Sequence, residues 1–338
     1  MAAEPRDALD AAARSRVTVV IGESDTGKTS LVAALANALF SRDATVAIVD
    51  ADIGQSEIGP PTTVGLGRVT RQLGRPADAE VVVLRFVGAT SAARDLRATV
   101  QATGQLVDRA RALGFERVIV DTSGLVRGDL GRRLKQAKID AIAPDLVIAL
   151  QRAGECEPIL RVYEERADRL RVLRLPAVAS ARRRTAAERR RHRDQAFAAH
   201  FAGATEIVLD LSRVELRSPA LFVGTPLSAS ELRRIEASMG GEIFWGERRG
   251  REVTVVTSSA RGEPAVRALA RELSVARVTA RTLTDLLDVI AGLDDENRES
   301  LWLGVVRRVD FAARTMTVTT RAPRARVASV TVGRERSR

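Results

Sequence analysis

Gly22-Glu23-Ser24-Asp25-Thr26-Gly27-Lys28-Thr29 matches the phosphate-loop pattern G-x-x-x-x-G-K-[ST]. An apolar, β-branched run at residues 17–21 precedes it, and leucines at helical spacing follow it at positions 31, 35 and 39. The glycines let the loop turn its N–H groups toward phosphates, and the N-terminus of the next helix adds partial positive charge. We therefore expect this loop, together with Ser30, to bind a nucleoside triphosphate, with Lys28 reaching the β- and γ-phosphates and Thr29 ligating Mg²⁺.

Strands and helices alternate around this loop. Apolar runs at residues 45–49, 81–86, 118–121 and 146–150 are typical of strands, and residues 29–40 and 91–113 have the spacing of amphipathic helices. Strands that are apolar on both faces indicate a parallel sheet covered on both sides. The predicted fold class is therefore α/β, a phosphate-loop NTPase sheet with helices on both faces, over residues 16–205.

The pattern changes after about residue 205, which predicts a smaller, β-rich α+β domain at residues 206–338. Its strands are expected at residues 207–211, 252–257, 304–309 and 315–320, and its helices at residues 228–239, 263–273 and 284–291. Residues 1–15 are expected to be flexible, and residues 333–338 to form a frayed basic tail.

The composition limits the chemistry. The 338 residues carry a net charge of +11 with only 11 aromatic side chains, and three of the 54 basic residues are lysines. Polyanions are thus the expected partner class. Because Cys156 is the only cysteine and the two histidines, His192 and His200, are expected at the surface, any metal must be held by oxygen ligands. No apolar run is long enough to cross a bilayer and no secretory signal is recognisable, so we expect a cytoplasmic protein without membrane contact.

Two acidic segments follow expected strands. Residues 50–55 read Asp50-Ala51-Asp52-Ile53-Gly54-Gln55, and residues 121–124 read Asp121-Thr122-Ser123-Gly124. Carboxylates at the carboxyl ends of such strands face the ligand crevice, where they accept a proton or hold Mg²⁺. Turn formation by aspartate is the alternative, and the residues alone leave both open.

An arginine-rich segment at residues 182–194 has seven arginines against two acidic residues. Guanidinium groups beside a phosphate loop stabilise the charge of a transferring phosphoryl group. A solvated basic helix face explains the same composition, so this second reading also stays open.

Taken in order along the chain, these segments resemble one family, the polynucleotide 5′-hydroxyl kinases related to factors of messenger-RNA 3′-end formation, transfer-RNA splicing and ribosomal-RNA maturation. The resemblance rests on the phosphate loop, the D-x-D-x-G-Q string at residues 50–55, residues 86–91, Thr122-x-Gly124 with residues 126–128 after it, an arginine-rich lid at about residues 180–197, and residues 301–306. The last of these segments is similar to the β-rich tail of the short prokaryotic members.

The resemblance implies a kinase that uses ATP and Mg²⁺ and phosphorylates the 5′-hydroxyl end of RNA, or of DNA. In it, Asp52 would be the general base, Lys28 would stabilise the γ-phosphate, and Thr29 and Asp121 would hold Mg²⁺. The lid arginines would be Arg184 and Arg189. The acceptor would be contacted by Gln55, Thr122, Gly124 and Arg193.

One departure from the family pattern concerns the acceptor. Leu125 occupies the position at which the family usually has a tryptophan, and leucine offers no ring on which a base could stack. Leu125 favours a second reading, an ATP-binding RNA-processing factor with little or no transfer activity. A third reading is a regulatory phosphate-loop NTPase, because Asp121-Thr122-Ser123-Gly124 resembles the strand end of switch-type enzymes. The sequence decides neither between RNA and DNA nor which protein partners the chain has.

Overall fold

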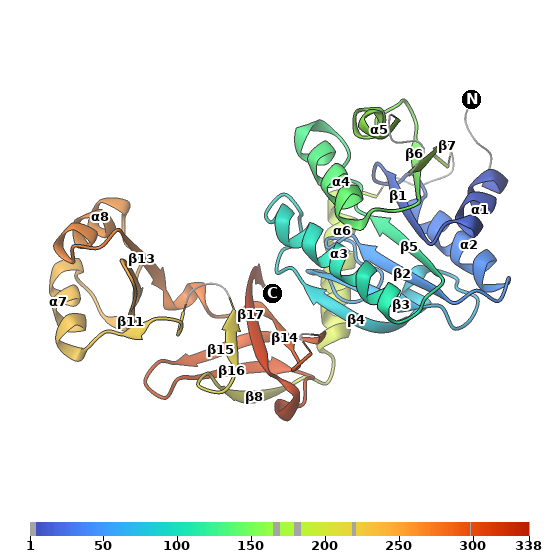
Figure 1. Ribbon diagram of the computed structural model, residues 1–338. Helices are drawn as coiled ribbons and strands as arrows, with labels where there is room; N and C mark the ends of the chain where they lie inside the picture. Colours follow the sequence, from blue (N-terminus) through green and yellow to red (C-terminus); the bar gives the residue numbers. More distant parts are fainter. Residues whose placement is uncertain (1–4, 165–169, 179–183, 218–220, 298, 338) are drawn as a thin grey trace. The chain divides into compact units, whose positions relative to one another are not determined.

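The chain forms two compact units, Met1–Ala202 and Gly203–Arg338, which are considered separately. A computed structural model describes residues 5–164, 170–178, 184–217, 221–297 and 299–337 (Figure 1). Residues 180–183, at the start of the expected lid, therefore lie outside the described residues. No helix in the described part of the chain combines the length and apolarity needed to cross a bilayer.

The first unit is built on one sheet with the strand order β7-β6-β1-β5-β2-β3-β4. Its strands are β1 (Val17–Gly22), β2 (Val46–Ala51), β3 (Thr63–Arg68), β4 (Glu80–Phe86), β5 (Arg117–Thr122), β6 (Leu146–Gln151) and β7 (Arg171–Pro176). From β7 to β2 every pairing is parallel, whereas β3 is antiparallel to both of its neighbours. The predicted α/β fold class is confirmed.

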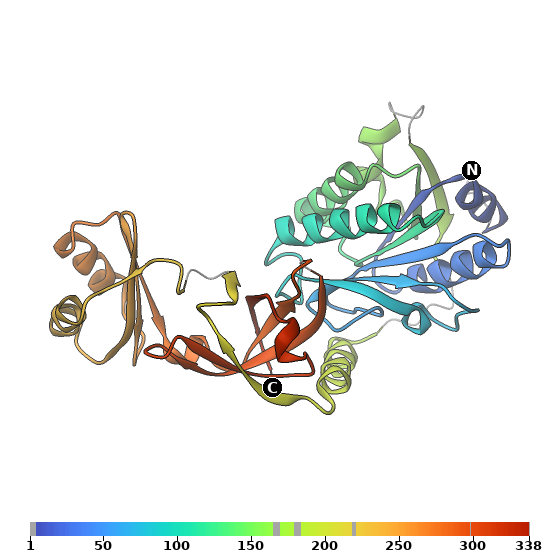
Figure 2. The same cartoon turned by 60° about the horizontal axis from the view of Figure 1, so that its bottom comes forward.

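Helices cover both faces of this sheet (Figure 1 and Figure 2). They are α1 (Pro5–Arg14), α2 (Lys28–Phe40), α3 (Leu96–Ala112), α4 (Gly128–Ile142), α5 (Glu157–Glu164) and α6 (Ala186–Phe201). Side chains alternate along the strands, so Val19 and Ile21 face the core under α3, α4 and α5, while Val20 faces the core under α1 and α2. Helix α6 differs from the others because none of its residues is buried.

The second unit contains two sheets. Its strands are β8 (Thr205–Asp210), β9 (Glu215–Arg217), β10 (Thr225–Pro226), β11 (Ile243–Arg249), β12 (Glu252–Thr257), β13 (Arg277–Thr282), β14 (Val289–Asp294), β15 (Ser300–Asp310), β16 (Thr315–Thr320) and β17 (Ser329–Arg336). One sheet pairs its strands in the order β9-β17-β14-β15-β16-β8, and the other in the order β10-β11-β12-β13. Helices α7 (Ala229–Met239) and α8 (Glu263–Glu272) pack against the second of these sheets.

Three expectations at the level of elements are wrong. Residues 1–15 were expected to be flexible, but α1 (Pro5–Arg14) buries Ala8, Ala11 and Ala12 against α2 and the sheet, and residues 1–4 lie outside the described residues. The helix expected at residues 284–291 is instead the short turn η2 (Leu283–Asp285) followed by strand β14, whose residues are all buried. The expected basic tail belongs to β17, which pairs with β14 as far as Arg336.

Candidate active site

The phosphate loop joins β1 to α2. Gly27, the residue before α2, has the left-handed φ of 94°, and a Cβ there would lie 2.6 Å from Cγ2 of Val178. Gly22 is equally constrained, because its Cβ would lie 2.5 Å from the carbonyl oxygen of Leu150. Since glycine at the start of α2 has no side chain to cap the helix, the first N–H groups of α2 are left for an anion.

Lys28 is folded back into this loop. Its Nζ donates a hydrogen bond of 2.7 Å to the carbonyl oxygen of Glu23, which also accepts from the Thr26 hydroxyl at 2.8 Å. The side chain is 7% exposed, and burial lowers the pKa of Lys28. The Lys28 ammonium group therefore lies within the phosphate loop, where a triphosphate would bind.

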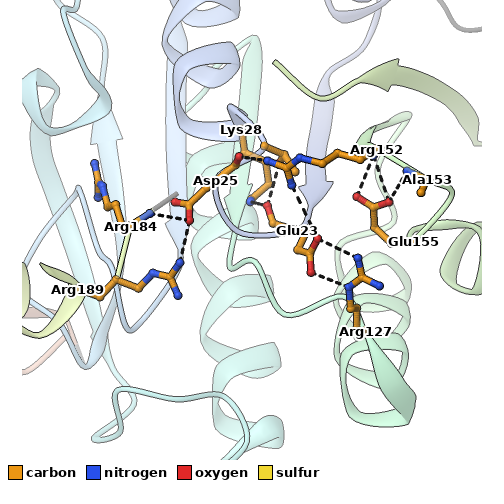
Figure 3. A network of polar contacts seen from close by, with 10 residues as sticks. Glu23, Asp25, Lys28, Arg127, Arg152, Ala153, Glu155, Arg184 and Arg189 are labelled. Carbon is orange, nitrogen blue, oxygen red and sulfur yellow. Dashed lines mark hydrogen bonds and ion pairs between the residues drawn. The ribbon is translucent and has the colours of Figure 1, made fainter. Parts of the chain in front are cut away.

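Arginines brace the outer side of the loop (Figure 3). The Glu23 carboxylate accepts from Nε of Arg127 at 2.6 Å and from its Nη2 at 3.1 Å, and this pairing lowers the pKa of Glu23. Arg152 donates to the carbonyl oxygen of Asp25. The Glu23 carboxylate is therefore engaged by an arginine outside the loop, while its carbonyl oxygen holds Lys28 inside it.

Three aspartates lie at the carboxyl ends of the neighbouring strands β2 and β5. Asp50 and Asp121 are register partners across β2 and β5, and Asp52 follows directly after β2. Asp50 is 2% exposed, and its carboxylate accepts from the backbone N–H groups of Asp52 and Ile58 at 3.0 Å each. Burial, together with the charge of Asp121, raises the pKa of Asp50 to about 7. Asp50 thus organises the loop after β2.

Asp52 and Asp121 have different surroundings. Oδ1 of Asp52 accepts from the N–H groups of Gly54 at 3.1 Å and Gln55 at 3.0 Å, so a tight turn fixes this half-buried carboxylate. Oδ2 of Asp121 accepts from the Thr29 hydroxyl at 3.0 Å. Within the described residues, Oδ1 of Asp121 is shielded from solvent and has no hydrogen-bond partner. Burial raises the pKa of Asp121 to about 6.

The two remaining lysines of the chain lie behind these carboxylates, on α4. Lys135 and Lys138 are 0% and 1% exposed. Lys135 donates to the carbonyl oxygen of Ser123 at 2.5 Å, and Lys138 to that of Ala51 at 2.9 Å, so each ammonium group fixes one strand end. Burial lowers the pKa of Lys138 to about 8 and that of Lys135 well below its usual value.

The arginine-rich segment reaches the phosphate loop from the other side. Arg189 on α6 donates to Oδ2 of Asp25 at 2.8 Å, and the backbone N–H of Arg184 donates to the same atom at 3.1 Å (Figure 3). The carbonyl oxygen of Arg189 also accepts from Nε2 of Gln55 at 3.1 Å. The start of α6 is thereby tied both to the phosphate loop and to the loop after β2.

These elements enclose a cleft of about 520 Å³. The residues that line it are Ser24, Asp25, Gly27, Lys28, Thr29, Ser30, Asp50, Asp52, Gln55, Glu57, Asp121, Thr122, Gly124, Arg184, Glu188, Arg189, Arg191, His192 and Gln195. Most residues singled out in the sequence are therefore brought together. Arg193 is not among the described residues that line the cleft, and neither are Gly22, Glu23 and Thr26.

Thr122 and Gly124 have structural contacts at the wall of the cleft. The Thr122 hydroxyl donates to the carbonyl oxygen of Val20 at 2.8 Å, and the residue is 1% exposed. A Cβ on Gly124 would lie 2.6 Å from Cα of Ser24, so glycine lets this loop pack against the phosphate loop.

Sequence reasoning missed the face that α6 presents to the cleft. Glu188, His192 and Gln195 lie there at positions i, i+4 and i+7, a spacing that the sequence does contain. His192, which was expected at the surface, is half-buried and lines the cleft. The buried lysines were also missed, although they are the only lysines besides Lys28 in an arginine-dominated chain.

Residues 22–203 match the family described as mRNA cleavage and polyadenylation factor CLP1 P-loop. A polyribonucleotide 5′-hydroxyl-kinase of Pyrococcus furiosus is 30% identical over 302 residues, covering 89% of this chain and 82% of that protein. One of Methanocaldococcus jannaschii is 28% identical over 302 residues, covering 89% and 81%. The wild-type Clp1p–Pcf11p complex contains a chain similar in fold, with a TM-score of 0.60 at 14% identity over 95% of this chain and 74% of that one.

Proposed function

Because this chain belongs to the CLP1 P-loop family, we propose that its cleft transfers the γ-phosphoryl group of ATP to the 5′-hydroxyl end of RNA. The chain is a phosphotransferase that uses ATP. One observation supports the assignment of roles most strongly: Asp52, Lys28 and Arg189 line the same cleft although they come from three different elements. Transfer needs a base, a phosphate cradle and positive charge at one place.

Asp52 is the general base in this proposal. The turn at Gly54 and Gln55 occupies its Oδ1 and leaves Oδ2 for the acceptor hydroxyl. Asp50 is less suited, because it is 2% exposed and holds backbone N–H groups with both carboxylate oxygens. As the 5′-oxygen bonds to the γ-phosphorus, its proton passes to Asp52, the bond to the β,γ-bridging oxygen breaks, and ADP leaves.

The triphosphate is held by the N–H groups of the loop at residues 22–30 and by Lys28, which exchanges its bond to the Glu23 carbonyl for phosphate oxygens. Arg189 and Arg184 lie beside the loop and supply guanidinium donors to the transferring group. Arg189 leaves Asp25 when it does so. Gln55 and Arg193 contact the acceptor strand, and Thr122 and Gly124 shape the wall that it meets.

The residues beside the loop also fit Mg²⁺. Thr29 and Asp121 offer a hydroxyl and a carboxylate, and Oδ1 of Asp121 has no hydrogen-bond partner within the described residues. Clusters of three or more His, Cys, Asp or Glu side chains suited to a metal are absent from the described part of the chain. Mg²⁺ typically takes only one or two protein oxygens and completes its shell with phosphates and water. Bound there, it would neutralise charge on the phosphate oxygens.

The test uses the full-length protein with γ-labelled ATP, Mg²⁺ and oligonucleotides of one sequence, made as RNA and as DNA. Each is supplied with a 5′-hydroxyl end and, as a control, with a 5′-phosphate end. We expect label at the 5′ end of the hydroxyl RNA and none on the phosphorylated controls. Tight ATP binding without transfer to any acceptor would overturn the proposal and favour an ATP-binding processing factor. Label on DNA at the same rate would extend the substrate class to DNA.

A further inference from the structure

One lysine buried on α4 has no part in the phosphoryl transfer just described. Lys138 is 1% exposed, and its Nζ donates to the carbonyl oxygen of Ala51 at 2.9 Å. Taking an ammonium group out of water is costly unless hydrogen bonds and opposite charges compensate. An apolar side chain of similar length would fill this place on α4 without that cost. Packing alone therefore does not account for a lysine at this position.

The chain uses lysine at few places. Three of its 54 basic residues are lysines, and every other basic side chain is an arginine. Lys28 lines the cleft, while Lys135 and Lys138 bind the carbonyl oxygens of the strand ends behind it. Arginine ends in a planar group with five donors, whereas lysine ends in a compact ammonium group on an unbranched stem. The compact group suits a buried site in which one backbone carbonyl is the acceptor.

The hydrogen bond from Lys138 ends on the peptide group that joins Ala51 to Asp52. The N–H of the same peptide group donates to Oδ1 of Asp50 at 3.0 Å. Because a peptide group is planar, hydrogen bonds at both its carbonyl oxygen and its N–H fix its orientation. The Cα atom of Asp52 lies in this plane. The main chain of the proposed base is therefore held from the side of α4.

The carboxylate of Asp52 depends on this orientation. Its Oδ1 accepts from the N–H groups of Gly54 and Gln55, so the side chain and the turn after it form one unit. A rotation of the peptide group before Asp52 would move this unit relative to the acceptor hydroxyl. Displacing a reacting group by about 1 Å can slow a reaction about 100-fold.

The charge of Lys138 acts on the same part of the cleft. Burial lowers the pKa of Lys138 to about 8. The opposing effect on this pKa comes from three aspartates at the carboxyl ends of β2 and β5, of which Asp52 contributes most. The ammonium group thus lies where it stabilises negative charge at these strand ends.

We infer that Lys138 is a positioning residue of the transfer reaction, which orients Asp52 toward the acceptor hydroxyl through the carbonyl oxygen of Ala51. The inference rests on the proposed kinase function, with Asp52 as its base. Lys138 is not among the described residues that line the cleft, so it acts on Asp52 from behind. Lys135, one turn earlier on α4, holds the carbonyl oxygen of Ser123 after β5 in the same way. Helix α4 thereby holds the ends of both strands that carry the aspartates.

The experiment measures the kinetics of the full-length protein with ATP, Mg²⁺ and a 5′-hydroxyl RNA. Lys138→Met keeps the length of the side chain and removes both the donor and the charge. We expect kcat to fall about 10- to 100-fold, with the KM for ATP and the affinity for ATP unchanged. Lys138→Gln, whose amide still donates from a side chain one atom shorter, should lie between Lys138→Met and wild type. It provides the same comparison if Lys138→Met does not fold.

A double-mutant cycle shows whether Lys138 acts through Asp52. In single-turnover reactions of Asp52→Asn, adding Lys138→Met should change the rate by less than about twofold, because the base that Lys138 orients is already absent. A further fall as large as the one measured in the wild-type background would overturn the inference, and so would a wild-type kcat in folded Lys138→Met.

Ile139→Val is the matched control, because Ile139 is the next residue of α4, is 2% exposed and packs into the core of the first unit. It should lower the melting temperature and keep the wild-type kcat. A kcat lowered as much in Ile139→Val as in Lys138→Met would show that transfer responds to any change in the packing of α4, which also overturns the inference. Failure of wild type to phosphorylate any acceptor would contradict the proposed function instead.

Discussion

Asp52 is the residue on which the transfer step depends in this proposal, because it combines a fixed carboxylate with a position in the cleft. Asp52→Asn keeps the turn, since the amide oxygen still accepts from Gly54 and Gln55, but removes the proton acceptor. We expect kcat to fall by about 10²- to 10⁴-fold. ATP affinity, measured by equilibrium binding, should stay near that of wild type. Asp129→Asn on the exposed start of α4 is the control, and a kcat retained in Asp52→Asn would remove this residue from the role of base.

The buried carboxyl group of Asp121 lowers the stability of the fold at neutral pH. Its pKa is raised from 3.8 to about 6 by burial, so the native state holds a proton on Asp121 between these pH values that the unfolded state releases. Stability from this group is therefore complete below pH 4, falls as the pH rises through about 6, and is constant above that. Two pKa units correspond to about 3 kcal/mol. The pKa of Asp50 is raised to about 7, so its contribution to stability also falls as the pH rises.

Asp121→Asn should therefore unfold at higher urea concentration than wild type at pH 7 when nucleotide and Mg²⁺ are absent. The difference in the free energy of unfolding should approach about 3 kcal/mol at pH 7 and shrink toward zero near pH 4. The neutral amide is stabilising at pH 7 because it places no charge in the buried site. Added MgATP should stabilise wild type and not the variant. Unfolding curves that differ by the same amount at both pH values would contradict this assignment of charge.

At this scale the sequence predicts whatever is local and misses what the tertiary fold decides. The phosphate loop and both aspartate strings are contiguous, so their place at strand ends follows from the pattern of apolar runs. The different roles of Asp50 and Asp52 do not follow from this pattern. They depend on the chain turning back so that Ile58 and its neighbours donate hydrogen bonds to Asp50. The roles of Lys135 and Lys138 depend in the same way on the register of α4 against β2 and β5.

Among the elements, α6 is held with little help from the core. It buries none of its residues, and a capping box fixes its start. In this box Thr185 Oγ1 accepts from the N–H of Glu188 at 3.2 Å, and the Glu188 carboxylate accepts from the N–H of Thr185 at 2.7 Å. Polar contacts of Arg189 to Asp25 and Gln55 complete the attachment. A helix held in this way is expected to open locally at low free-energy cost.

Thr185→Ala should consequently affect catalysis more than global stability. Losing the cap costs about 1 kcal/mol of helix stability, so amide exchange in α6 should become about fivefold faster and kcat should fall, while the melting temperature changes little. Ser228→Ala is the matched control, since Ser228 and Glu231 form the same capping box on α7, which packs Ile235 and Met239 into a core. That variant should lose stability and keep wild-type kinetics. The opposite pair of results would show that α6 has no part in transfer.

Some elements could not be predicted from the sequence because packing and strand pairing, rather than local propensity, decide their secondary structure. Strand β3 has glycine at position 67 because a Cβ there would lie 2.9 Å from Cδ1 of Ile58, and its two glycines weaken the strand signal of Thr63 and Val64. Strand β14 has apolar residues whose spacing also suits a helix, and only its pairing with β15 and β17 decides for a strand. Among the described strands, β7 pairs with β6 alone, and it ends in a proline.

For the whole molecule, charge and scarcity of aromatic rings determine how nucleic acid is held. The net charge is +11, only 11 side chains are aromatic, and no Phe, Tyr or Trp lines the described cleft. We therefore expect log kcat/KM for the acceptor to fall linearly with log salt concentration, by about 0.7 per phosphate contacted, equally for unrelated RNA sequences of one length. Arg191→Gln, which removes a cleft arginine, should lower this slope by about 0.7, whereas Arg190→Gln, which alters an exposed neighbour outside the cleft, should leave it unchanged. A slope near zero for wild type, or the same slope in both variants, would mean that contacts other than phosphates dominate binding.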